Sequence, residues 1–191
     1  MMKKSLLLLA ALILGGCATH WPETALLNPQ VIPSNQQYYS GNRITMEGVD
    51  KREAAYVFSI KKKEKAPVLV NSSQPLNNLL AEKLAEGLRS QGLEVGNSGT
   101  TNLTLAISTA AVTVEEKTFT YVTKSKVSLQ VIADFQGNKL TKQFNMSSSK
   151  EGPGEPTMAD LESTLNQQLG SVLQQIMADE ALRGYLKGQP S

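Results

Sequence analysis

The sequence has very few of the side chains from which most catalytic and metal sites are built. Among its 191 residues there is one cysteine, Cys17, and one histidine, His20. A single thiol cannot form a disulfide within the chain, and one histidine cannot complete a zinc site, which needs three or four protein ligands. A Ser-His-Asp triad would have to use His20, which lies in a polar, proline-containing segment. We therefore expect no metal, no cofactor and no enzyme activity.

A pronounced charge of either sign is also absent. The chain has 19 Lys and Arg residues against 17 Asp and Glu residues, and Lys3 and Lys4 account for the excess. These two lysines belong to an N-terminal segment that we expect to be removed, which leaves a neutral protein. Nucleic-acid binding needs a basic surface, so the composition argues against a nucleic-acid partner.

Residues 1–16 have the three parts of a lipoprotein signal peptide. The two lysines precede an apolar run at 6–14, which is too short to span a membrane because a span needs about 20 apolar residues. The segment ends in Leu14-Gly15-Gly16-Cys17, where small residues precede the cysteine that receives a diacylglycerol. We predict that acyl chains on Cys17 anchor the protein to a membrane. The alternative is an ordinary cleaved signal peptide with a chance cysteine.

The residue after Cys17 predicts whether the lipoprotein stays in the inner membrane or moves to the outer membrane. The segment that follows has the composition of a tether. Ala18 stands where an aspartate commonly retains lipoproteins in the inner membrane, so we expect a periplasm-facing protein of the outer membrane. Prolines recur through residues 17–40, which predicts an extended tether with a short edge strand near Val31 and Ile32. Trp21 would then be an interfacial aromatic residue. Residues 41–188 remain as a single domain.

Hydrophobic periodicity predicts strands and helices in that domain. Alternating apolar residues predict strands near 44–47 and 56–60, and residues 61–73 have the composition of a loop. A helix with Ser73 as N-cap and Pro75 at its first position would end at Gly92. Its apolar stripe consists of Leu76, Leu79, Leu80, Leu84 and Leu88. A second helix would begin near Thr157, with a stripe at Leu161, Leu165, Leu169, Val172, Leu173 and Ile176, and Asp179 would cap a short third helix.

Two hairpins are predicted between residues 103 and 146. A type II′ turn at Gly137-Asn138 would pair Phe135 with Leu140, Val131 with Phe144, and Leu129 with Met146. The apolar face would continue back through Val127 and Tyr121 to Phe119, and a turn near Glu116 would set Val114 opposite Phe119. Keeping Ile107 on that face requires a β-bulge at Ala110 or Ala111. The expected fold class is α+β with two layers, an antiparallel or mixed sheet and two main helices on one face.

Two groups of charged residues are candidate sites. Lys61, Lys62, Lys63 and Lys65 could contact lipopolysaccharide phosphates, anionic lipid headgroups or an acidic partner, and the alternative is a solvated loop. Asp50 and Arg52 could form a functional turn. The alternative there is an aspartate that stabilises the turn beside a solvated arginine.

Several short motifs together resemble a known family. They are the Cys17 signal, Gly48-Val49-Asp50-Lys51-Arg52, Gly92-Leu93-Glu94-Val95-Gly96, Gly137-Asn138-Lys139 with Thr141-Lys142, and Glu151-Gly152. This set resembles the YajG family of uncharacterised bacterial lipoproteins over nearly the whole chain. The resemblance implies a lipid-anchored protein of the Gram-negative envelope, and it implies no activity or substrate.

The sequence therefore predicts a non-enzymatic, lipid-anchored outer-membrane lipoprotein that serves as a binding or accessory module. A possible envelope protein partner gives the first alternative, an auxiliary subunit of a transport or assembly complex. The second alternative is an uncharacterised envelope hydrolase, for which Asp50 would be the residue to test.

Overall fold

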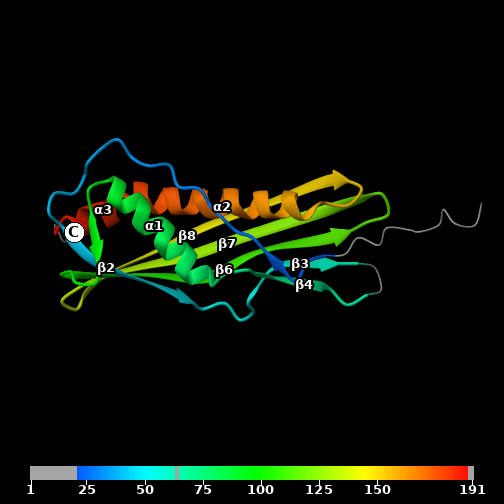
Figure 1. The fold of residues 1–191 in the computed structure, drawn as a ribbon, viewed down its shortest axis with the longest axis horizontal. Coiled ribbons are helices and arrows are strands. Elements are labelled where there is room, and N and C mark those ends of the chain that lie inside the picture. Colours follow the sequence, from blue (N-terminus) through cyan, green and yellow to red (C-terminus); the bar gives the residue numbers. More distant parts are fainter. Residues whose placement is uncertain (1–20, 63–64, 189–191) are drawn as a thin grey trace, which may run out of the picture.

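The computed structural model describes residues 21–62 and 65–188, and these residues form a mixed α+β fold. Within them lie three helices and a curled sheet of eight strands that contains both parallel and antiparallel pairs (Figure 1). The α+β prediction and the mixed sheet are confirmed. The predicted signal peptide at 1–16, Cys17 and His20 lie outside the described residues.

The elements follow one another in two blocks. The first block contains β1 (Thr24–Ala25), β2 (Arg43–Asp50), β3 (Tyr56–Lys61), β4 (Val68–Ser72), α1 (Leu76–Ser90) and β5 (Glu94–Gly96). The second contains β6 (Thr101–Glu116), β7 (Thr120–Phe135), β8 (Asn138–Pro153), α2 (Met158–Ala178) and α3 (Glu180–Leu186). Strand β4 lies where a loop is predicted over 61–73, so that prediction is wrong for residues 68–72.

Strand β6 organises the sheet because each of its edges is paired differently. One edge pairs with β7 along nearly its whole length, and β7 pairs in turn with β8, all antiparallel. The other edge pairs in parallel with two strands, first with β2 at 101–107 and then with β3 at 112–115. Beyond β2 lies β5, and beyond β3 lie β4 and β1. The sheet therefore forks along this edge of β6.

The β7–β8 hairpin has the predicted facing in a different register. Its turn residues are Gln136 and Gly137, with φ of 52° and 89°, so that both central positions take left-handed conformations. Phe135 pairs with Asn138, and Leu129 pairs with Phe144 rather than with Met146. The register differs from the prediction by two residues, and a shift of two keeps each side chain on its face.

The β6–β7 hairpin is also shifted, by four residues. Val114 pairs with Thr123 rather than Phe119, which lies at the tip of the hairpin and is 84% exposed. The prediction that the apolar face reaches Phe119 is therefore wrong. The bulge is confirmed, but it lies between Ile107 and Thr109, so Ser108 is the extra residue instead of Ala110 or Ala111.

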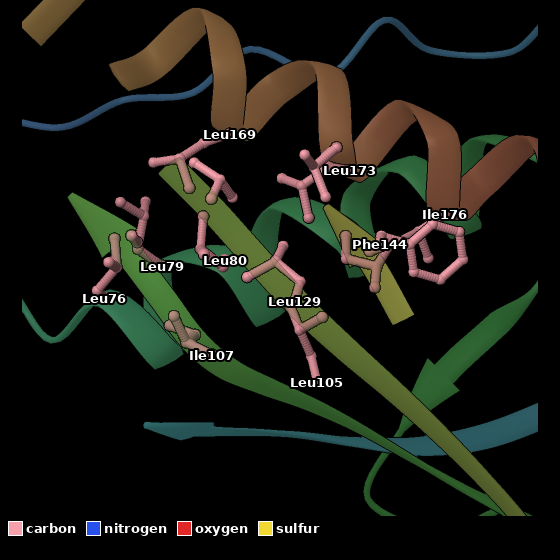
Figure 2. Close-up of a cluster of buried hydrophobic side chains, with 14 of the residues drawn as sticks. Leu76, Leu79, Leu80, Leu105, Ile107, Leu129, Phe144, Leu169, Leu173 and Ile176 are labelled. Atoms are coloured by element: carbon pink, nitrogen blue, oxygen red, sulfur yellow. The ribbon is translucent and has the colours of Figure 1, made fainter. Parts of the chain in front are cut away.

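The helices end near their predicted residues, and both predicted stripes are buried. Pro75 is the N-cap of α1 without a side-chain cap, so the prediction of Ser73 is wrong, while Thr157 and Asp160 form a complete capping box at α2. Figure 2 shows Leu79 and Leu80 of α1 on the side of Ile107. It also shows a second group from α2, Leu169, Leu173 and Ile176, above Leu129 and Phe144.

Residues 21–40, which we name the N-terminal strap, are part of the folded unit. Thr24 pairs with Asn71 in β4, and Trp21, Leu27 and Tyr39 are buried in the core. The prediction of a tether is therefore wrong for residues 21–40. Trp21 is a core residue rather than an interfacial one, and the short strand lies at Thr24–Ala25 instead of near Val31 and Ile32.

Side chains of α2 hold the strap by accepting hydrogen bonds from its backbone. The N–H of Leu26 donates to Glu162 Oε1 at 2.8 Å, and that of Asn28 donates to Asn166 Oδ1 at 2.8 Å. Further along, the N–H of Ile32 donates to Gln174 Oε1 at 3.3 Å. These bonds satisfy backbone groups that no strand neighbour reaches.

Candidate functional site

The fork in the sheet leaves a cleft beside β6. Pairing with β2 ends at Ile107 and pairing with β3 begins at Val112, so residues 108–111 have no strand partner on that edge. The connection from β2 to β3, residues 51–55, passes beside this gap and encloses a cleft of about 420 Å³. The cleft is lined by Lys51, Arg52, Glu53, Ala54, Tyr56, Ser108, Thr109, Ala110 and Ala111.

Asp50 and Arg52 form a two-point ion pair at the start of this connection. Arg52 Nε donates to Asp50 Oδ1 at 2.9 Å, and Arg52 Nη2 donates to Oδ2 at 2.8 Å. The backbone N–H of Arg52 also donates to Asp50 Oδ1, which closes the turn, and Nη1 donates to the carbonyl of Tyr56 at 3.3 Å. The Arg52 side chain is 7% exposed, so the alternative of a solvated arginine is wrong.

The chemistry of this pair is that of a structural clamp. The side-chain hydrogen bond from Arg52 holds the pKa of Asp50 below its usual value, against burial, which raises it. A carboxylate kept ionised by three hydrogen bonds is a poor proton donor at neutral pH. Lys51 and Glu53 are exposed charged residues that also line the cleft, together with the exposed Ser108.

The lysine cluster is divided by its ion pairs. Lys62 Nζ lies 3.2 Å from Glu116 Oε1 and 3.7 Å from Glu155 Oε1, so its charge is balanced. Lys61 and Lys65 are exposed at the surface. Lys63 lies outside the described residues, and among the other three the backbone N–H of Lys65 donates to the carbonyl of Lys62 at 3.3 Å.

A groove between the strap and α2 was missed by sequence reasoning. It has a volume of about 590 Å³ and is lined by Gln30, Ile32, Ser163, Asn166, Gln167, Gly170, Ser171 and Gln174. No charged residue occurs in α2 from 163 to 178. Ile32, which lines the groove, is 71% exposed. Leu26, earlier in the strap, is 69% exposed. The uncharged outer face of α2 was the available signal, because a solvated helix face usually carries charges.

No three His, Cys, Asp or Glu residues of 21–62 and 65–188 are placed to hold a metal ion. Within the same ranges, each helix is too short or too polar to cross a bilayer.

Comparison with known proteins identifies the family. Residues 29–187 match the family described as "Uncharacterized lipoprotein". The chain is similar to "Uncharacterized lipoprotein YajG" of Escherichia coli, with 27% identity over 190 residues that cover 98% of both chains. The protein of the same name from a second Escherichia coli strain has the same identity and coverage.

Solved structures share the fold at much lower sequence identity. The crystal structure of a Xanthomonas campestris protein has a TM-score of 0.64 and 10% identity, and the match covers 88% of this chain and 99% of that one. This likeness concerns the fold alone. The family match spans most of the sequence and agrees with the resemblance seen in its motifs, and the chain therefore belongs to this family of uncharacterized lipoproteins.

Proposed function

We propose that this protein is a lipid-anchored lipoprotein of the outer membrane whose folded domain faces the periplasm and acts as a non-enzymatic binding or accessory module. Membership of a lipoprotein family and the signal that ends at Cys17 support the anchor. Ala18 after the lipidated cysteine supports the outer membrane as its destination.

Membership of a lipoprotein family is the observation that carries this proposal, and the burial of Trp21 limits how far the folded domain can lie from the anchor. Trp21 is 7% exposed and belongs to the core, and it follows Cys17 by four residues. A fully extended chain spans at most about 3.6 Å per residue, so the folded domain begins within about 14 Å of the acylated cysteine. The anchor therefore holds the domain at the membrane surface instead of suspending it on a long tether.

The proposed layer arrangement places α1 and α2 over the same face of the sheet. Buried side chains alternate along β6 and β7, at Leu103, Leu105 and Ile107 in one and at Val127, Leu129 and Val131 in the other. Figure 2 shows labelled side chains of both helices on the side of Leu105, Ile107 and Leu129. The opposite face and the fork cleft would then both be open to a ligand, and the exposed charges of Lys51 and Glu53 in the cleft favour a small polar ligand.

The groove along α2 favours the second candidate function, an auxiliary subunit of an envelope transport or assembly complex. Its uncharged polar side chains and the exposed Leu26 and Ile32 match the composition of a protein contact, which is depleted in charge at its centre. Co-purification of a membrane partner that depends on Ile32 would favour this candidate, and the change Ile32→Glu is the variant to compare.

Acyl labelling in cells tests the anchor. We expect labelled lipid on the wild-type protein and none on Cys17→Ser, because the diacylglycerol is attached to the cysteine sulfur. The matched control His20→Ala leaves that thiol in place and should label like the wild type. Undiminished labelling of Cys17→Ser would refute the proposal.

A further inference from the structure

We infer that the tip of the β6–β7 hairpin is a membrane-contacting element, with Phe119 inserted between the lipid headgroups beside the acylated Cys17. This inference rests on the proposed lipid anchor. It assigns a lipid surface as the partner of a residue that the fold leaves outside the core.

Phe119 is held out to solvent by an ordered tip. It is 84% exposed, which is more than any other large hydrophobic side chain among the described residues. The N–H of Lys117 donates to the carbonyl of Thr120 at 2.8 Å, and the N–H of Gly154 donates to the carbonyl of Phe119 at 3.0 Å. The backbone is therefore fixed on both sides, and the aromatic ring projects from a rigid support.

The strand pairing places the start of β1, the first strand of the described residues, toward the same end of the molecule. Strand β1 runs parallel to β4, so the residues before Thr24 come from the side of Val68. Val68 pairs with Ile60, and Ile60 pairs with Val114 in β6. Figure 1 shows β3 and β4 at the end toward which the β6 arrow points, with α3 at the other end.

The number of residues from this end of the sheet to Phe119 is similar to the number from Trp21 back to Cys17. Phe119 is five residues beyond Val114, and Cys17 is four residues before Trp21. At up to about 3.6 Å per residue, each segment extends at most about 14–18 Å. A bilayer that holds the acyl chains of Cys17 is therefore within reach of the hairpin tip.

The charges at this end are mixed: Glu115 is paired with Lys124 at 3.2 Å, and Lys61 adds an exposed cation. Lys61 pairs with Glu115 in the ladder next to the tip, and its side chain is exposed. An exposed lysine near an inserted aromatic residue is the usual combination in interfacial membrane contacts, because the cation remains at the level of the anionic headgroups. The ion pair of Lys117 with Glu151, at 3.3 Å, keeps the base of the tip polar.

Fluorescence quenching in vesicles tests the inference. The full-length lipidated protein is placed on vesicles of phosphatidylethanolamine and phosphatidylglycerol that carry bromine on their acyl chains. The substitution Phe119→Trp adds an indole at the tip, while the buried Trp21 of the unsubstituted protein gives the background. We expect the added indole to be quenched about twofold more strongly than this background, because interfacial side chains reach the boundary of the acyl region.

A matched variant places the same probe at the opposite end of the molecule. Asn138 is exposed at the turn of the β7–β8 hairpin, so the indole in Asn138→Trp should be quenched no more than the background. Equal quenching of the two variants, or none in either, would overturn the inference. A blue shift of the Phe119→Trp emission without bromine quenching would also overturn it, because the tip would then be buried in another copy of the chain.

Acyl labelling on the same samples separates this inference from the proposed function. If the protein is lipidated and bound to the vesicles while Phe119→Trp is not quenched, only the membrane contact of the hairpin tip fails. If the protein carries no acyl label and does not bind the vesicles, the anchor and the inference fail together.

Discussion

Two adjacent leucines of the N-terminal strap provide a matched test of whether residues 21–40 belong to the folded unit. Leu27 is fully buried, whereas Leu26 is 69% exposed, and the chemistry of truncation to alanine is identical at the two positions. The hydrogen bond from Leu26 to Glu162 uses the backbone N–H and therefore survives in Leu26→Ala. The two alanine variants therefore differ mainly in how deeply the truncated side chain is buried.

The expected magnitudes follow from the burial of the two side chains. Truncation of a buried leucine removes transfer free energy and leaves a cavity, which together lower the free energy of unfolding by about 2–5 kcal/mol. Leu26→Ala should change it by no more than about 0.5 kcal/mol, as for other surface substitutions. For a domain of this size, 1 kcal/mol corresponds to about 2–4 °C in Tm, so Leu27→Ala should lower Tm by roughly 4–20 °C.

Urea unfolding followed by circular dichroism provides the measurement, on a chain that starts at Trp21 and keeps every residue the structure describes. The midpoint of Leu27→Ala should fall while the slope of the transition stays constant, because the fold itself is unchanged. Small and equal changes in both variants would refute the reasoning, because residues 21–40 would then behave as a tether.

Other properties can be tested in the same way. Val131 is fully buried in β7, so Val131→Asp should lower the free energy of unfolding by at least about 3 kcal/mol. Gln130→Asp on the other face should stay within about 0.5 kcal/mol, and similar losses in the two variants would show that the strand facing is wrong. The pKa of Asp50 is lowered in the folded protein by the hydrogen bond from Arg52, so its stabilisation is complete above the unfolded pKa and is lost as the pH falls through the folded one. Between about pH 5 and pH 2 the wild type should therefore lose more stability than Asp50→Asn, and parallel pH profiles would contradict this. Membrane fractionation should find the wild type with the outer membrane and Ala18→Asp with the inner membrane, and a wild type in the inner membrane would contradict the sorting argument.

The facing of the long strands could be predicted from the sequence because it depends on a period of two. Both hairpin registers differ from the prediction, by two residues in one and by four in the other, and even shifts keep the same side chains buried. The turns themselves were harder to predict. Gln136 adopts a positive φ, which is uncommon for glutamine and is therefore not predicted by the residue type. Asp134 supports the turn by accepting a hydrogen bond from the N–H of Gly137.

The docking of the strap against α2 could not be predicted, because the backbone donors and the side-chain acceptors that hold it lie in segments far apart in the sequence. Pro22, Pro29 and Pro33 suggested a tether, and prolines are equally compatible with an extended segment whose backbone pairs with side chains. The acceptors lie on α2, where Asn166 and Gln174 share one face of the helix. The uncharged composition of that face is compatible with a covering segment, but it does not say which segment covers it.

The fork gives the motif Gly48-Val49-Asp50-Lys51-Arg52 a structural explanation that no local pattern provides. A side chain at Gly48 would meet the carbonyl oxygen of Asn77 at 2.2 Å, so α1 can approach β2 only if this position is glycine. Two residues later β2 leaves β6, and Asp50 and Arg52 close the turn at the gap. The burial of Arg52 follows from the parallel pairing of β2 and β3 with the same edge of β6. Because that pairing joins residues 54 to 57 positions apart, the sequence could indicate the turn but could not indicate that its arginine is enclosed.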